Sequence, residues 1–78
     1  MTSEKNEQVC RALLGYMTDH DVLRVDVARH IGRSNSYVGE RLSGERDLSL
    51  DIMAGVAELT RVSMEALMVE LVTRMRPV

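Results

Sequence analysis

The chain has 78 residues, of which 45% are hydrophobic and 28% are charged, with both signs of charge present. This composition supplies one small core, whereas two independent domains would each be too short to bury one. A disordered tail, a disulfide scaffold and a membrane span are excluded, since Cys10 is the single cysteine and no apolar run approaches about 20 residues. We therefore predict one soluble, cytoplasmic domain over residues 1–78, with a polar N-terminus that is unlike a signal sequence.

The net charge of −2 is unevenly distributed. Residues 24–46 contain five Arg and three acidic residues, whereas acidic residues outnumber basic ones on both sides of this stretch. Affinity for nucleic acid rests on cations that displace counterions from phosphate. The central concentration of Arg therefore keeps DNA binding open despite the acidic total.

The first two helices are predicted over residues 4–18 and 25–31. The first has apolar side chains spaced by three and four along one face, and these are Val9, Ala12, Leu13, Tyr16 and Met17. The second ends at Gly32 as a C-terminal cap. Its alternating start at residues 25–27 would also suit a strand, but a single strand without a partner forms no sheet.

Three further helices are predicted from serine caps and apolar spacing. Ser34 caps a helix over residues 35–43, with Val38 and Leu42 as its buried edge and Gly44 closing it. Ser49 and Ser63 cap the fourth and fifth helices, the last of which spans residues 64–75. The predicted class is therefore all-α, with five helices and short links.

The stretch from residue 24 to 44 places small residues where two helices cross. Ala28 allows a close approach, Gly32 permits a sharp turn, and Val38 can pack back against Ala28. The second helix of the pair keeps a face without large apolar groups, formed by Asn35, Ser36, Gly39, Glu40 and Ser43. A small polar helix face of this kind can enter a DNA major groove.

These residues resemble the phage-repressor and Cro type of helix-turn-helix protein, the XRE family. The resemblance covers Arg24 to Leu67 and includes the runs Ser-Tyr-Val at 36–38, Leu-Ser-Gly at 42–44, Leu-Ser-Leu at 48–50 and Val-Ala-Glu-Leu at 56–59, which leads to residues 62–67. It implies a lambda-repressor-like fold and binding to double-stranded operator DNA. It also implies a sequence-specific transcriptional regulator of phage or prophage type.

The resemblance assigns roles to individual residues. The implied base-reading residues are Asn35, Ser36, Tyr37 and Glu40. The implied contacts to the DNA backbone are Arg24, Arg33, Ser43 and Arg46. Other interpretations stay open: the small polar residues as solvated positions, Tyr37 packed on the domain edge, Glu40 paired with an Arg, and Arg24 or Arg33 paired with Asp26.

Three positions depart from the family pattern. Leu23 stands where Ser or Thr usually caps the helix, so we expect that cap to come from elsewhere or to be absent. Arg41 replaces a core residue, and we expect Leu42 to supply the packing while Arg41 points outward. Gly39 lies inside a short helix at a cost of about 1 kcal/mol.

The fifth helix continues its apolar stripe through Leu71, Val72 and Met75, beyond the part that resembles the family. We predict that these side chains are exposed and form a homodimer contact. The alternative is that they fold back on Val9 and Leu13 of the first helix.

No arrangement of residues indicates catalysis. Cys10, His20 and His30 are spaced by ten, which fits no metal-binding pattern, and no nucleophile motif or phosphate loop is present. We expect no enzyme activity, metal, cofactor or small-molecule ligand. The predicted function is a dimeric repressor acting by promoter occlusion in the cytoplasm of a bacterial cell; the alternative is an antitoxin-like or accessory protein-binding module.

Overall fold

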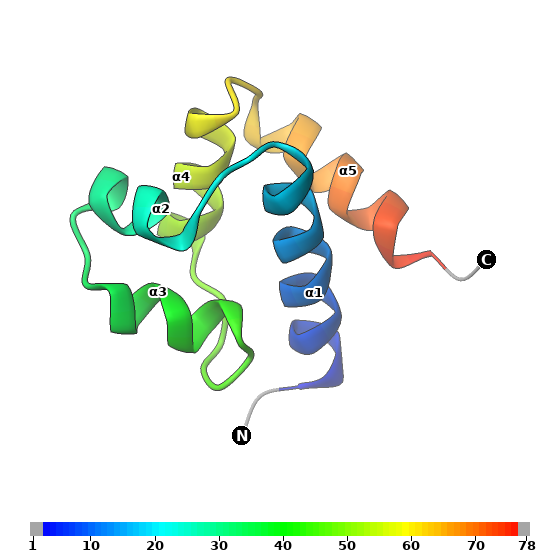
Figure 1. Ribbon diagram of the computed structural model, residues 1–78. Helices are drawn as coiled ribbons and strands as arrows, with labels where there is room; N and C mark the ends of the chain where they lie inside the picture. Colours follow the sequence, from blue (N-terminus) through cyan, green and yellow to red (C-terminus); the bar gives the residue numbers. More distant parts are fainter. Residues whose placement is uncertain (1–2, 77–78) are drawn as a thin grey trace.

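The computed structural model describes residues 3–76, which form five α-helices (Figure 1). They are α1 Glu4–Asp19, α2 Arg24–Ile31, α3 Asn35–Leu42, α4 Leu50–Leu59 and α5 Met64–Met75. The predicted all-α class and helix order are confirmed, and the predicted bounds differ from the observed ones by at most one residue. None of the helices described is long and apolar enough to cross a membrane.

The helix ends confirm most of the predicted caps. The hydroxyls of Ser34 and Ser63 accept hydrogen bonds of 3.0 Å from the backbone N–H groups of the third helical residue, Tyr37 and Ala66 respectively. Gly32 ends α2 in the left-handed region, with φ 71°, where glycine avoids the strain that a side chain would meet.

Two helix starts differ from the predicted pattern. Ser49 is the N-cap residue of α4, as predicted, but its side chain accepts from no backbone N–H of the helix. The hydroxyl donates to the Asp51 carboxylate instead. At the start of α2, the Asp26 carboxylate accepts a 3.0 Å hydrogen bond from the N–H of Leu23. This contact is one half of a capping box, whereas the other half, a side-chain acceptor at Leu23, is absent.

The helices pack around one core (Figure 1). α1 contacts α5 and α3, whereas α2 contacts α3 and α4. Ala28 and Val38, the predicted crossing pair, are both buried in this core, and Leu42 is fully buried beside them. The turn at Gly32 and this shared core position α3 against the rest of the domain.

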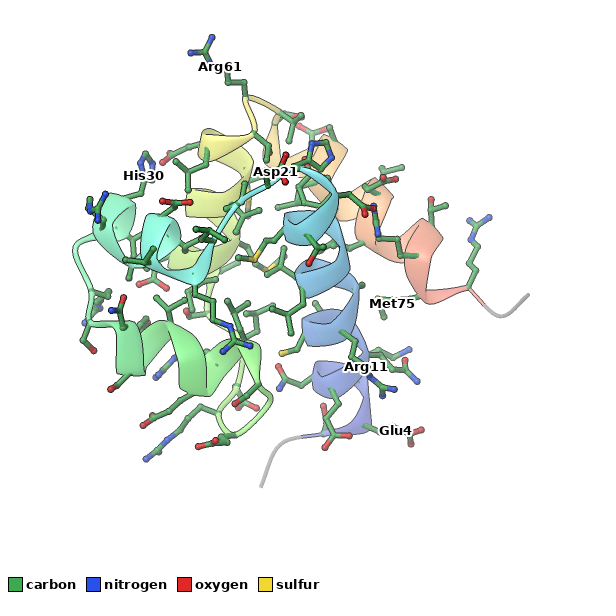
Figure 2. All side chains as sticks on the ribbon, in the orientation of Figure 1. Glu4, Arg11, Asp21, His30, Arg61 and Met75 are labelled. Atoms are coloured by element: carbon green, nitrogen blue, oxygen red, sulfur yellow. The ribbon has the colours of Figure 1, made fainter. Side chains whose placement is uncertain are left out.

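The predicted exposed stripe at the end of α5 requires a correction. Leu71 is only 1% exposed and belongs to the same core as Leu13 of α1, so its predicted exposure is wrong. Met75 is half-buried and packs against that core, and Figure 2 shows it on the side of α5 that faces α1. Val72, at 48% exposure, is the one member of the predicted set that remains on the surface. The fold-back alternative therefore describes Leu71 and Met75, because α5 lies along α1.

Gly55 allows α4 to approach α2 closely. A Cβ at this position would lie 2.6 Å from Cγ2 of Ile31, which is shorter than any normal contact. Ile31 is branched at Cβ, so this methyl cannot move away without shifting the side chain or the helix. The missing side chain at Gly55 therefore lets α2, and with it the turn and α3, pack closely against α4.

We predict that Gly55→Ala lowers the free energy of unfolding by about 1–2 kcal/mol, because overpacking outweighs the better helix propensity of Ala. Gly39→Ala is the matched control, since a Cβ at Gly39 meets nothing within 4 Å. The control is expected to be as stable as the parent protein or more so. Urea denaturation followed by circular dichroism measures both, and a Gly55→Ala protein of parental stability would contradict the proposed contact.

Candidate nucleic-acid interface

α3 offers a small polar surface to solvent. Val38 and Leu42 are fully buried, whereas Asn35 and Ser36 are exposed at the start of the helix. A Cβ built at Gly39 would meet no neighbouring side chain within 4 Å. A ligand can therefore approach the backbone of α3 here without meeting a bulky side chain.

Tyr37 lies at the edge of this surface and is held by α4. Its hydroxyl is 3.1 Å from both Asp51 carboxylate oxygens and 3.3 Å from the Ser49 hydroxyl. The guanidinium carbons of Arg33 and Arg41 lie 4.6 Å and 3.9 Å from the centre of its ring, within cation–π distance. With both its hydroxyl and its ring engaged, Tyr37 matches the edge-packing interpretation, and its role as a base reader stays a prediction.

Asp51 is the anion of this cluster. Its carboxylate accepts from the Ser49 and Tyr37 hydroxyls and lies 3.5 Å from Nε of Arg33. Hydrogen bonding from Ser49, assisted by Tyr37, the backbone and the charge of Arg33, lowers the pKa of Asp51 below its ordinary value of 3.8. Arg33 is therefore paired with Asp51, and not with Asp26 as one interpretation held.

The far end of α3 carries a second ion pair. Nε of Arg46 lies 3.7 Å from the Glu40 carboxylate, which matches the interpretation that Glu40 pairs with an Arg. The Ser43 hydroxyl donates a 3.0 Å hydrogen bond to the backbone oxygen of Glu40. Both side chains of the ion pair remain partly exposed, so the pair is weak and can exchange partners.

Two arginines near α3 have no carboxylate partner within residues 3–76. Arg24 is exposed at the first position of α2. The nearby Asp26 carboxylate accepts from the backbone N–H of Leu23 and forms no ion pair with Arg24. Arg41 is half-buried and its guanidinium stacks on the Tyr37 ring, while Leu42 is fully buried and supplies the packing, as predicted. The sequence analysis did not place Arg41 in the site, although its spacing of four from Tyr37 on one helix could have indicated this stack.

Other polar groups serve packing or solvent-exposed pairing. Cys10 is buried, its thiol donates to the backbone oxygen of Arg41 at 3.1 Å, and burial raises the pKa of that thiol. His30 pairs with Glu58 at 2.7 Å on the surface. Among residues 3–76, no three His, Cys, Asp or Glu side chains are grouped as metal ligands would be.

Two crystal structures are similar to this chain, and both are of the clp gene regulator ClgR from Corynebacterium glutamicum. One has a TM-score of 0.72 and 21% identity, covering 96% of this chain and 80% of that chain. The other has a TM-score of 0.70 and 22% identity, covering 94% and 95% respectively. The sequence matches no model of a protein family and no curated protein. At this identity the likeness establishes the fold, that of a helical helix-turn-helix protein.

The Asp51 cluster predicts a pH-dependent stability. A carboxyl group whose pKa is lowered by folding stabilises the native state above its unfolded pKa, and this contribution is lost as pH falls through the folded pKa. We expect Asp51→Asn to lower the free energy of unfolding by about 0.5–1 kcal/mol at pH 7, a modest value because the side chain is partly exposed. The difference from the parent protein should shrink below about pH 4.

Urea denaturation of both proteins at pH 7 and at pH 3 measures this difference. Glu45→Gln serves as the control for loss of an exposed carboxylate outside the cluster, since Glu45 forms no ion pair with the described residues. A stability difference for Asp51→Asn that is the same at the two pH values would contradict a role for the ionised carboxylate.

Proposed function

We propose that the protein is a sequence-specific DNA-binding transcriptional regulator in which α3 enters the major groove. The observation that carries the proposal is the surface of α3, which is anchored by Val38 and Leu42 and carries small polar groups or no side chain on its free side. An α-helix of this surface fits the width of the major groove, where base pairs present distinct hydrogen-bonding patterns. The fold shared with ClgR, a protein described as a clp gene regulator, supports the same function class.

The main base-reading contacts belong to the first turn of α3, and Glu40 in the second turn adds to them. Asn35 and Ser36 are exposed there, and an Asn amide can hydrogen-bond the adenine edge in two places. Glu40 can accept from a cytosine amine once Arg46 is drawn to a phosphate. Tyr37 then acts as a positioning residue, since its hydroxyl and ring are already engaged.

Backbone contacts come from cations on both sides of α3. Arg24 and Arg41 bring charge that no carboxylate among the described residues neutralises. Arg33 and Arg46 are held by exposed carboxylates, which a DNA phosphate can replace at little cost. Ser43 adds a hydroxyl at the end of α3.

We further propose that the regulator is a phage-type repressor that binds as a dimer and occludes a promoter. A single helix-turn-helix unit reads only a few base pairs, so two copies on half-sites about one helical turn apart are needed for useful specificity. Promoter occlusion is the simplest mechanism for such a dimer, because a protein that covers the promoter blocks polymerase through its DNA contacts alone.

A protein-binding module, antitoxin-like or accessory, is the second candidate. Two observations favour it: the chain is acidic overall, and carboxylates already neutralise Arg33 and Arg46 beside α3. Such a module would bind specific and random DNA equally weakly. The following experiment therefore separates the two candidates.

Selection from a pool of random double-stranded DNA is expected to yield one enriched sequence motif. Against that sequence, Asn35→Ala should cost about 1–3 kcal/mol of binding free energy and relax preference at one position, because a base contact is lost. Arg24→Ala should weaken binding to all sequences alike and reduce the dependence on salt, because a phosphate contact is lost. Fluorescence anisotropy at several salt concentrations measures both effects.

Arg61→Ala is the matched control for charge. Figure 2 shows Arg61 projecting from the link between α4 and α5, away from α3, and its side chain is exposed. This variant should bind the selected DNA as the parent protein does. If Asn35→Ala lowers affinity for selected and random DNA equally, Asn35 is not a base reader; if no sequence is enriched, the second candidate is favoured.

A further inference from the structure

α5 leaves three large apolar side chains on the surface. Met68, Val69 and Val72 are 42%, 67% and 48% exposed. Met68 and Val72 also line a groove of about 450 Å³ between α1 and α5, whose other apolar side chains are Val9, Leu71 and Met75. Surface apolar groups clustered in this way are typical of a protein contact.

Opposite charges lie at the two ends of this apolar stripe. Glu65 lies in the first turn of α5, and Arg76 is the C-cap residue at its end. The residues at positions 65, 69, 72 and 76 are separated by four, three and four residues, which is the spacing of positions on one side of a helix. Neither Glu65 nor Arg76 has an ion-pair partner within residues 3–76, whereas the neighbouring Arg74 is bound to Asp19 and Glu70. The stripe is therefore apolar in its centre, negative at its start and positive at its end.

We propose that this stripe binds the same stripe of a second copy of the chain, with the two α5 helices antiparallel about a two-fold axis. In this register Val69 packs against Val72 of the partner subunit, and Glu65 faces Arg76 of the partner subunit. Two-fold symmetry makes each contact occur twice. A parallel arrangement would instead place like charges together at both ends, which disfavours it.

The place of α5 in the fold suits this partner. α2 and α3 lie on one side of α1, and α5 extends on the other (Figure 1). Pairing through α5 therefore leaves α3 uncovered. The inference deepens the proposed function by naming the contact of its dimer, but it can be tested in the absence of DNA.

Sedimentation equilibrium of the purified full chain between about 1 and 100 µM tests the proposal. The parent protein is expected to form a dimer in this range. Val69→Glu should be monomeric throughout, and its helical circular dichroism should be unchanged because the Val69 side chain is exposed and outside the core. Leu50→Glu is the matched control, since it also replaces an exposed apolar side chain by Glu but lies on α4, and it should dimerise as the parent does.

Charge exchange tests the register. Arg76→Glu and Glu65→Arg should each raise the dimer Kd about 5- to 30-fold, because each places like charges together twice. The double variant with both changes should return to within about threefold of the parent, since the opposite charges face one another again. Failure of the double variant to recover would overturn the antiparallel register.

A parent protein that is monomeric at 100 µM, or a dimer that survives Val69→Glu, would overturn the interface itself. These outcomes are distinguishable from failure of the proposed function. A dimer that enriches no DNA sequence contradicts DNA binding alone, and a monomer that binds a selected sequence contradicts this interface alone.

Discussion

Val38 and Leu42 are the fully buried side chains of α3, and the half-buried Tyr37 packs against the same core. This packing leaves Asn35 and Ser36 exposed at the start of the eight-residue helix. The free surface keeps its position only if the supporting helices do not move. Gly32 sets the direction of α3 relative to α2, and the close approach at Gly55 holds α2 against α4.

Electrostatics beside α3 depend on pairs that are weak and exposed. Asp51 holds Arg33, and Glu40 holds Arg46, in a chain whose net charge is −2. Tyr37 keeps Arg33 and Arg41 at the same edge of the helix through its ring. These contacts order the long arginine side chains before any ligand arrives, which lowers the entropy that binding must remove. A phosphate can then take the place of a carboxylate.

Much of the fold could be predicted because local signals agree with the tertiary structure. Apolar spacing, the serine caps at Ser34 and Ser63, and Gly32 indicate helices and ends that are observed. The side-chain cap expected of Ser49 is absent because its hydroxyl donates to the Asp51 carboxylate and its oxygen accepts from the Tyr37 hydroxyl. The position of Tyr37, on another helix, could not be read from the sequence around Ser49. Sequence periodicity reveals a helix face but not which neighbour covers it.

The candidate site and α5 show the same limit. Asn35 and Ser36 could be expected on the surface from their place in α3, and they are exposed. Tyr37 was ambiguous in the sequence, since its role depends on Asp51 of another helix. The sequence predicts Leu71 on the surface because the size of the domain does not reveal which helix covers it, but α1 runs beside α5 and buries it.

Backbone amide chemical shifts provide the most direct test that α3 is the DNA-binding surface. The labelled protein is titrated with a double-stranded oligonucleotide carrying the selected sequence, and with a shuffled one at the same salt concentration. The largest changes specific to the selected sequence are predicted at Asn35, Ser36 and Gly39, with changes at Arg24 for both oligonucleotides. Specific changes confined to α1 and α5, or none at saturating DNA, would contradict this account.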